Sequence, residues 1–490
     1  MALSYPPDMV GRQTEWRRLE DFCKSGQDSA TLGIVWGRRR VGKSFLLQSI
    51  ADQTQGFYYG AVRGSKAEAL RELGARIAAD QDAPAPLLFD EWDSAVHALL
   101  DLGKSRERVV ILDEYPYLLE HSPELDSVIQ RFLEPRSRSR VESRTRLIIC
   151  GSALSVMRAI LSGTAPLRGR AGMDLRISPF DFRTARELHG IDDLRTAVNT
   201  FAVIGGVAAY AREMTADDLP EQADDFDRWI SDRVLSPAAP LFSEIPLLLS
   251  EDPATAKARK LNLYHATLAA IATGNHAHSK ITRYVKTSGA ALAPILEALV
   301  AAELVEQVQD PIRENRPTYH PADSLIRFHY AGIRPHQARL ARHGADTLAI
   351  WSSLQPTFRS QVLGPSFEGM ARFWARHFAD PELFGGYPDY VGPTTLTLAD
   401  GTECEIDVVV AAADSDTASE RTVRALGEAK VGERLSIRHL KRLEAARAAL
   451  GERGARAKII LIGTEFQKEL LEARRPDLKL VDLERLYHGD

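Results

Sequence analysis

Short apolar runs alternate with amphipathic stretches over the N-terminal part of the chain. The runs lie at residues 32–36, 56–62, 109–114 and 146–152, and a helical pattern follows the first of them over about 43–51. Each run is short and almost continuously apolar, which is typical of strands buried on both faces of a parallel sheet. The pattern therefore predicts an α/β domain over residues 1–184, with a parallel sheet covered by helices.

The next part of the chain has a helical character. Residues 185–260 are acidic with helical spacing, which predicts a helical lid. Residues 261–325 hold a helix ending at Gly274, a second ending at Gly289, and a third in AALAPILEALVAAELV, followed by a strand-turn-strand pattern. Three short helices and a hairpin predict a winged-helix unit, and residues 326–360 would connect it to the last domain.

The C-terminal block, residues 361–490, begins with the amphipathic segment SFEGMARFWARHF. Apolar runs follow at 403–412, 423–431 and 457–464, with helical patterns at 436–450 and 465–474 between and after them. Strands that alternate with helices in this way predict a small α/β domain with a mixed sheet. The D…E-x-K residues described below make this domain resemble the restriction-endonuclease-like folds.

Composition narrows the class of protein. The 490 residues are 44% hydrophobic and 26% charged, which is ordinary for a globular chain of several domains. A net charge of −5 argues against a general polycation, so a nucleic acid would be held by local basic patches. Cys23, Cys150 and Cys404 are too far apart to suggest a disulfide framework or a zinc ribbon. The sequence shows no signal peptide or membrane span, and we expect a cytoplasmic protein.

A glycine-containing loop joins the apolar run at 32–36 to the helix that follows it. The loop fits G-x-x-x-x-G-K-[ST], the P-loop, in the strand-to-helix setting that this motif requires. Its backbone N–H groups and the helix N-terminus would face the phosphates of ATP. We expect Lys43 to bridge the β- and γ-phosphates and Ser44 to bind Mg²⁺. The nucleotide-binding residues are Gly37, Arg38, Arg39, Arg40, Val41, Gly42, Lys43 and Ser44.

Two further strand ends supply polar groups for the same site. The run at 109–112 ends in Asp113 and Glu114, where ligands bind in parallel sheets. We expect Asp113 to hold Mg²⁺ through water and Glu114 to polarise the attacking water. The next run ends in Ser152, which could bond the γ-phosphate or cap the strand in solvent. Arg170, with Arg168 as the alternative, is the candidate arginine finger, acting in cis or from a neighbouring copy.

Several segments together resemble the archaeal-type ATPases, a family that also occurs in bacteria. They are the N-terminal Val10-Gly11-Arg12, Glu15 and Leu19, the loop GRRRVGKS, LDEYPYL (112–118), CGSALSVM (150–157), ISPFDF (177–182) and IGGVAAY (204–210). The resemblance implies an AAA+ module with a DExx-box, ATP binding, and a switch or homo-oligomer built on that module. Many members of the family append a winged helix and a nuclease-like domain. Gln13 departs from the acidic residue that is usual there.

The C-terminal domain carries a second candidate site. Asp407 lies in one predicted strand, and Glu428 and Lys430 lie two residues apart in the next, as in the D…E-x-K core of PD-(D/E)XK nucleases. Residues i and i+2 of a strand face the same side, so Glu428 and Lys430 should point together toward Asp407. Asp407 and Glu428 would bind Mg²⁺, Lys430 would position water or phosphate oxygens, and Glu368 on the preceding helix would complete the site. The alternative is an inherited fold in which these residues form only an ion pair.

These patterns predict an ATPase whose nucleotide state controls a metal-dependent nuclease, with a nucleic acid, DNA first, as its partner. The third helix of the winged-helix unit is poor in base-reading side chains, which favours backbone contacts or a structural role. The six arginines of 131–146 could follow phosphates or form a solvated loop. A rival interpretation is a nucleotide-gated regulator or scaffold with a silent nuclease fold. A metabolic P-loop kinase is disfavoured, because no acceptor site for a small molecule is evident.

Overall fold

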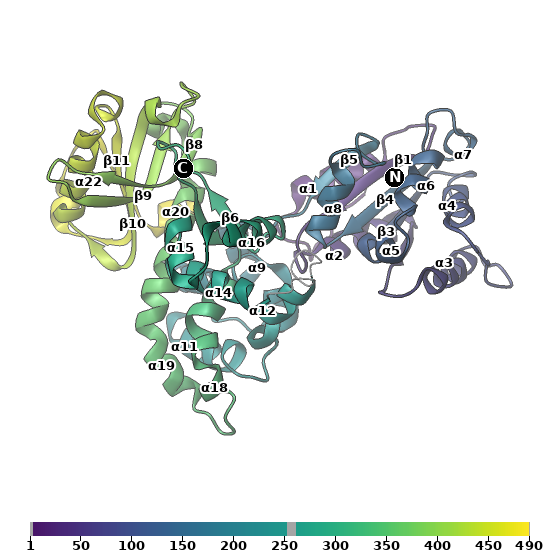
Figure 1. The fold of residues 1–490 in the computed structure, drawn as a ribbon, viewed down its shortest axis with the longest axis horizontal. Coiled ribbons are helices and arrows are strands. Elements are labelled where there is room, and N and C mark those ends of the chain that lie inside the picture. The colour runs from purple at the N-terminus through teal and green to yellow at the C-terminus, as the bar shows by residue number, and fades with distance from the viewer. Residues whose placement is uncertain (1–2, 252–260, 490) are drawn as a thin grey trace. The chain divides into compact units, whose positions relative to one another are not determined.

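The computed structural model describes residues 3–251 and 261–489. The chain forms two compact units (Figure 1). Of the described residues, the first unit holds 3–180, with short later segments at 207–209 and 249–251, and the second holds the remainder. The end of the predicted helical lid, residues 252–260, lies outside the described residues.

The first unit is built on a five-stranded sheet in which all strands are parallel, with the order β2-β3-β4-β1-β5. Its strands are β1 (Thr31–Trp36), β2 (Phe57–Gly60), β3 (Arg108–Asp113), β4 (Thr145–Gly151) and β5 (Ala171–Arg176). The predicted parallel sheet is confirmed. The sequence interpretation did not include β5, an edge strand whose outward residues are mostly polar or small.

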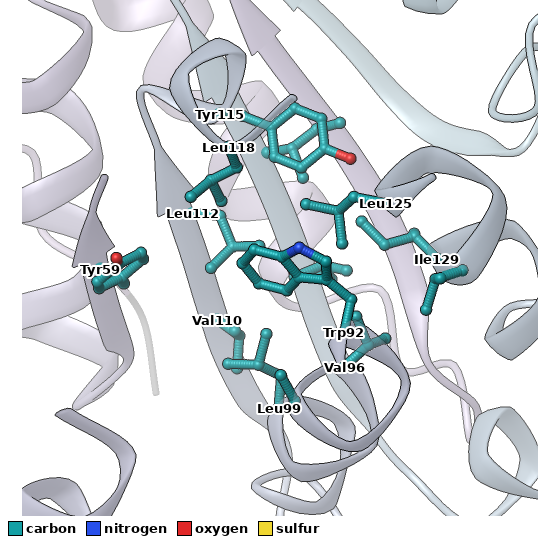
Figure 2. Close-up of a cluster of buried hydrophobic side chains, with 14 of the residues drawn as sticks. Tyr59, Trp92, Val96, Leu99, Val110, Leu112, Tyr115, Leu118, Leu125 and Ile129 are labelled. Atoms are coloured by element: carbon teal, nitrogen blue, oxygen red, sulfur yellow. The ribbon is translucent and has the colours of Figure 1, made fainter. Parts of the chain in front are cut away.

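Helices cover both faces of this sheet. On one face, Trp92 of α4 (Trp92–Asp101) packs among Val110 and Leu112 of β3 and residues of α6 (Leu125–Phe132), as Figure 2 shows. On the other face, Val109 and Ile111 pack with α1 (Gln13–Cys23) and α2 (Lys43–Thr54). Successive residues of β3 thus enter opposite cores, as the two-residue period of a strand requires. The other helices that contribute to the core of the first face are α3 (Lys66–Asp80), α5 (Tyr115–His121) and α8 (Leu154–Leu161).

The second unit begins with a run of helices. They are α9 (Phe182–His189), α10 (Leu194–Ile204), α11 (Ala223–Trp229), α12 (Pro240–Glu251), α14 (Leu261–Ala272), α15 (His278–Val285), α16 (Gly289–Ala301), α17 (Ser324–Phe328), α18 (Arg334–Leu340) and α19 (Thr347–Thr357). The predicted connector is therefore largely helical. None of the helices in the described part of the chain has the length and apolar character that a bilayer span requires.

The end of one of these helices was predicted wrongly. The helix expected to end at Gly289 ends at Val285, where Lys286 adopts a left-handed conformation with φ 56°. Gly289 instead begins α16, and the Ser288 side chain accepts a hydrogen bond from the backbone N–H of Ala291. Serine is a favoured N-cap, and this cap outweighs the tendency of glycine to end helices.

The last part of the chain folds around a mixed sheet with the order β12-β11-β10-β9-β8. Strands β10, β11 and β12 are parallel, and β8 and β9 are antiparallel to their neighbours. The elements are α20 (Gly364–His377), β8 (Tyr390–Thr397), β9 (Glu403–Ala411), β10 (Val423–Leu435), α22 (Ile437–Ala449), β11 (Lys458–Phe466), α23 (Lys468–Glu472), β12 (Leu478–Val481) and α24 (Leu483–His488). The predicted helix at 465–474 is shorter than expected, because β11 continues to Phe466.

A hairpin follows α16, as predicted, with strands β6 (Val305–Val308) and β7 (Thr318–Pro321). The loop between them is packed into the C-terminal domain. Ile312 is fully buried and belongs to the hydrophobic core of the C-terminal sheet. Asp310 accepts a hydrogen bond from Thr394 Oγ1 at 2.7 Å, and Pro311 O accepts one from Arg421. The loop of the hairpin therefore packs within the second unit.

Candidate functional site

The loop between β1 and α2 has the backbone of a phosphate cradle. A Cβ added at Gly37 would lie 2.0 Å from the carbonyl oxygen of Ile177, so only glycine fits there. Arg40 and Gly42 have φ of 70° and 92°, and Gly42 precedes the first residue of α2. The backbone N–H of Ala209 donates to Arg40 O at 3.1 Å and supports the loop from the 207–209 segment. This backbone conformation fits a loop that wraps around a phosphate group.

Lys43 lies inside this loop. Its side chain is buried, and its Nζ donates to the backbone oxygen of Arg38 at 2.7 Å. Burial lowers the pKa of Lys43, while the negative charges nearby act in the opposite direction. A phosphate bound in the loop would give this buried ammonium the anionic partner that it lacks. The geometry fits a nucleoside triphosphate.

Asp113 is the hydrogen-bonding centre at the end of β3. Its Oδ2 accepts from Ser44 Oγ at 2.7 Å and from the Tyr58 hydroxyl at 2.6 Å. Burial alone would raise the pKa of Asp113, but hydrogen bonds from Tyr58, Cys150 and Ser44 outweigh burial and lower it. The carboxylate therefore stays ionised, with the Ser44 oxygen beside it. Two adjacent oxygens of this kind suit a magnesium ion on the nucleotide phosphates.

Glu114 and Ser152 lie next to each other, although they come from different strand ends. The Ser152 hydroxyl lies 3.0 and 2.8 Å from the two carboxylate oxygens of Glu114. Glu114 has a left-handed backbone with φ 52°, which is uncommon for a residue other than glycine and is held here by its surroundings. The carboxylate is thus positioned by a hydroxyl, which suits a group that polarises water.

The N-terminal segment reaches the P-loop through Arg12, a contact that the P-loop motif does not predict. Its Nη2 donates to Val41 O at 3.0 Å and to Ser178 O at 2.8 Å. Its guanidinium also lies 3.8 Å from the ring centre of Phe180. Arg12 therefore ties the phosphate loop to the segment that ends the first unit.

The predicted arginine finger is not settled by these contacts. Arg168 and Arg170 are both exposed, and Arg168 Nη1 donates to Gly163 O at 2.7 Å. The role of either residue stays a prediction.

In the arginine-rich segment 131–146, the side chain of Arg146 is buried and donates to Ser29 O and Gln27 O, and Arg138 pairs with Glu142. Part of this segment therefore packs within the first unit and does not form an exposed basic patch.

Tyr58 offers a prediction for the nucleotide site. Tyr58→Phe removes one donor to Asp113, and because such a hydrogen bond contributes about 0.5–1.5 kcal/mol, we expect a roughly two- to tenfold loss of affinity for Mg–ADP. Calorimetric titration with ADP should show this loss with Mg²⁺ and not with EDTA. Tyr59→Phe is the matched control, since Tyr59 bonds Ala69 O instead. An equal loss in both buffers would contradict a role through the metal-binding carboxylate.

The C-terminal candidate residues also come together. Lys430 Nζ lies 3.0 Å from Asp407 Oδ2, 3.0 Å from Glu428 Oε1 and 3.1 Å from Ala429 O. The backbone N–H of Ala429 donates to Asp407 Oδ2 at 2.9 Å. Three oxygens thus surround one cationic nitrogen, and such a set of hard oxygen donors fits a magnesium ion in chemical terms.

Other charged side chains border this acid pair. Arg442 of α22 forms an ion pair with Glu428. Burial, followed by the negative charge of Asp407, raises the pKa of Glu368 to about 7. Among the described residues, no group of three or more His, Cys, Asp or Glu side chains could hold a metal ion. Glu368 therefore does not form a three-carboxylate ligand set with Asp407 and Glu428, and its part in catalysis stays a prediction.

Comparison with known proteins bears on the first unit. Residues 9–193 match a family described as an ATPase domain predominantly from Archaea, which supports ATP binding and an ATPase function for this part of the chain. An uncharacterized protein of Methanocaldococcus jannaschii is 25% identical over 370 residues, 74% of this chain and 76% of that protein. A Walker-type ATPase of Pyrococcus abyssi has a TM-score of 0.48 at 21% identity, covering 67% of this chain and 99% of its own. The ORC2 protein of Aeropyrum pernix, in ADPNP and ADP complexes, has a TM-score of 0.43 at 16% identity, covering 72% and 97%.

Proposed function

We propose that this chain is an ATPase that couples its nucleotide state to a metal-dependent nuclease site acting on nucleic acid, with DNA as the first candidate. The observation that carries the proposal is the convergence of Asp407, Glu428 and Lys430 on one point of the C-terminal sheet. A magnesium ion bound here would activate water and neutralise charge that develops on the phosphate. Lys430 would then be free to donate to the water or to a phosphate oxygen.

The surface of helices α14–α16 favours contacts with the nucleic-acid backbone over contacts with base edges. Helices α14–α16 and the hairpin β6–β7 would form the winged helix of the proposal. The exposed positions of α16 include Ala291, Pro294 and Glu297, which offer no donor for base edges. The hairpin loop, which would be the tip of the wing, is packed in the C-terminal domain and is therefore not exposed to contact nucleic acid. We therefore propose that the substrate is held through its phosphates, with little sequence preference.

Coupling between the two activities is supported by the chain path that leaves the first unit. Arg12 binds the P-loop and Ser178, and the chain enters the second unit at Asp181, directly after Phe180. There Phe182 packs edge-on against Phe378 and Tyr487. A short segment of the chain would thus transmit movements of the P-loop to the C-terminal domain. A homo-oligomer formed through the ATPase module is part of the same proposal.

The docking of α9 on the C-terminal helix strengthens this path. Arg183 Nη2 donates to Leu486 O at 2.8 Å, and Arg183 Nε donates to the same oxygen at 3.0 Å. The guanidinium also lies 3.9 Å from the ring centre of Phe378. The segment that follows the ATPase core is therefore fixed to the domain that holds the proposed nuclease site.

The test is a cleavage assay with the full-length protein. Wild type is incubated with Mg²⁺ or Mn²⁺ and with DNA or RNA, in the presence and absence of ATP. We expect cleavage of at least one polymer, and we expect Lys430→Ala to lower its rate by about 10²–10³-fold, because it removes a donor to the reacting phosphate. Lys468→Ala, at an exposed lysine of the same domain, should leave the rate unchanged.

The second candidate is a nucleotide-gated regulator or scaffold in which the nuclease fold is silent. The observation that favours it is that Lys430 and Arg442 already neutralise the acid pair. In that case, wild type would cleave no substrate under any nucleotide condition. ATP would still change the affinity for nucleic acid, which fluorescence anisotropy on a labelled duplex would measure.

A further inference from the structure

Two positively charged side chains compensate the negative charge of Glu428. Its side chain is fully buried, Lys430 lies 3.0 Å from Oε1, and the Arg442 guanidinium contacts Oε2. Asp407 shares the same ammonium at 3.0 Å. The two carboxylates and the two cationic groups therefore sum to zero before any metal ion arrives.

A divalent cation added to this arrangement would leave the site strongly positive. Lys430 Nζ lies 3.0 Å from a carboxylate oxygen of Asp407 and 3.0 Å from one of Glu428, so a positive charge already occupies the space between the two acids. Arg372 does not change this balance, because its Nη1, which donates to the backbone oxygen of Asp407 at 3.1 Å, also lies 3.9 Å from Glu368 Oε2. Uncompensated charge in a buried site is costly. Metal binding therefore requires that a cationic side chain leaves, or that an anion enters.

Arg442 is the cationic group best placed to leave. Its side chain is 40% exposed, whereas that of Lys430 is 27% exposed and that of Glu428 is 0% exposed. Arg438 lies one turn earlier on the same face of α22, and both Arg438 and Lys441 are exposed. These three side chains form a basic stripe that begins at the acid pair. A planar guanidinium binds phosphate oxygens through two parallel hydrogen bonds, which suits the backbone of a nucleic acid.

We propose that Arg442 is a phosphate-binding residue that pairs with Glu428 until a nucleic-acid strand arrives, so that the strand and the divalent cation bind together. A backbone phosphate draws Arg442 away from Glu428 Oε2, and the freed oxygen becomes a ligand. The phosphate also supplies negative charge that offsets the cation. This inference rests on the proposed nuclease function and names the order in which that site is filled.

Metal binding without any nucleic acid gives the first test. Full-length nucleotide-free protein is titrated with Mn²⁺, and free Mn²⁺ is measured by electron paramagnetic resonance. We expect Arg442→Gln to bind Mn²⁺ at least about tenfold more tightly than wild type, since it removes the competing positive charge beside Glu428. Lys468→Gln, at an exposed lysine outside the stripe, should match wild type, and Arg442→Lys, which keeps the charge, should stay close to it. The P-loop site is common to all four proteins and cancels in the comparison.

The second arm measures the linkage from the nucleic-acid side. Anisotropy of a labelled duplex is recorded in Ca²⁺ and in EDTA, because Ca²⁺ takes oxygen ligands of the same kind. Binding of the two ligands together requires that Ca²⁺ raises duplex affinity for wild type and for Lys468→Gln, and that this gain shrinks in Arg442→Gln. The inference is overturned if wild type binds Mn²⁺ as tightly as Arg442→Gln, or if Ca²⁺ has no effect on duplex binding. The cleavage assay with Lys430→Ala judges the nuclease function separately.

Discussion

Glu114→Gln should slow ATP hydrolysis by about 10²–10⁴-fold, the range expected for loss of a group that assists proton transfer. The amide keeps the size of the carboxylate and can still meet the Ser152 hydroxyl, but it cannot polarise a water molecule as an anion does. The P-loop, Lys43 and Asp113 are untouched, so ATP affinity should stay within a few-fold of wild type. Phosphate release and calorimetric ATP titration measure the two effects separately.

Glu120→Gln is the control for this substitution. Glu120 lies on helix α5, which follows Glu114, and its partner is Arg63 at 3.5 Å on the surface. It should hydrolyse ATP at the wild-type rate. If Glu114→Gln turned over ATP as fast as wild type, the water-polarising role would belong to another residue. Loss of ATP binding in Glu114→Gln would point instead to a structural role for this left-handed position.

The nucleotide site could be predicted because its chemistry is local in sequence. The loop from Gly37 to Ser44 holds most of the phosphate-binding backbone within one short segment, and Asp113 follows an unmistakable apolar strand. Tyr58 and Arg12 could not be found in this way. Each acts on the site from another element, through contacts that depend on the order of strands in the sheet and not on spacing along the chain.

The C-terminal domain shows a similar limit. Asp407, Glu428 and Lys430 follow from the two-residue period of a strand, and the structure brings them together. The sequence did not reveal β8, because Pro393 and several threonines interrupt its apolar pattern. Proline is tolerated there since β8 is an edge strand of the sheet. The pairing of Arg442 with Glu428 depends on how α22 packs on β10, which no local pattern encodes.

The loop of the β6–β7 hairpin is the clearest case in which tertiary packing changes an interpretation. A wing that contacts nucleic acid would expose its tip, whereas Ile312 is fully buried among the C-terminal core residues. Glu314 adds a hydrogen bond from the backbone N–H of Ala418 at 3.0 Å. An isolated isoleucine between Pro311 and Arg313 carries no periodic signal, so the sequence could not show that this loop belongs to another domain's core.

We therefore expect Ile312→Ala to destabilise the C-terminal domain by about 2–5 kcal/mol, the cost of removing a large aliphatic side chain from a closed core. Hydrogen exchange in β8, β9 and β10 should accelerate, and the thermal transition of the full-length protein should move to lower temperature. Arg316→Ala, at an exposed position of the same loop, should change stability by less than about 0.5 kcal/mol. A free wing would give the opposite pattern, with Ile312→Ala leaving hydrogen exchange unchanged and Arg316→Ala weakening duplex binding.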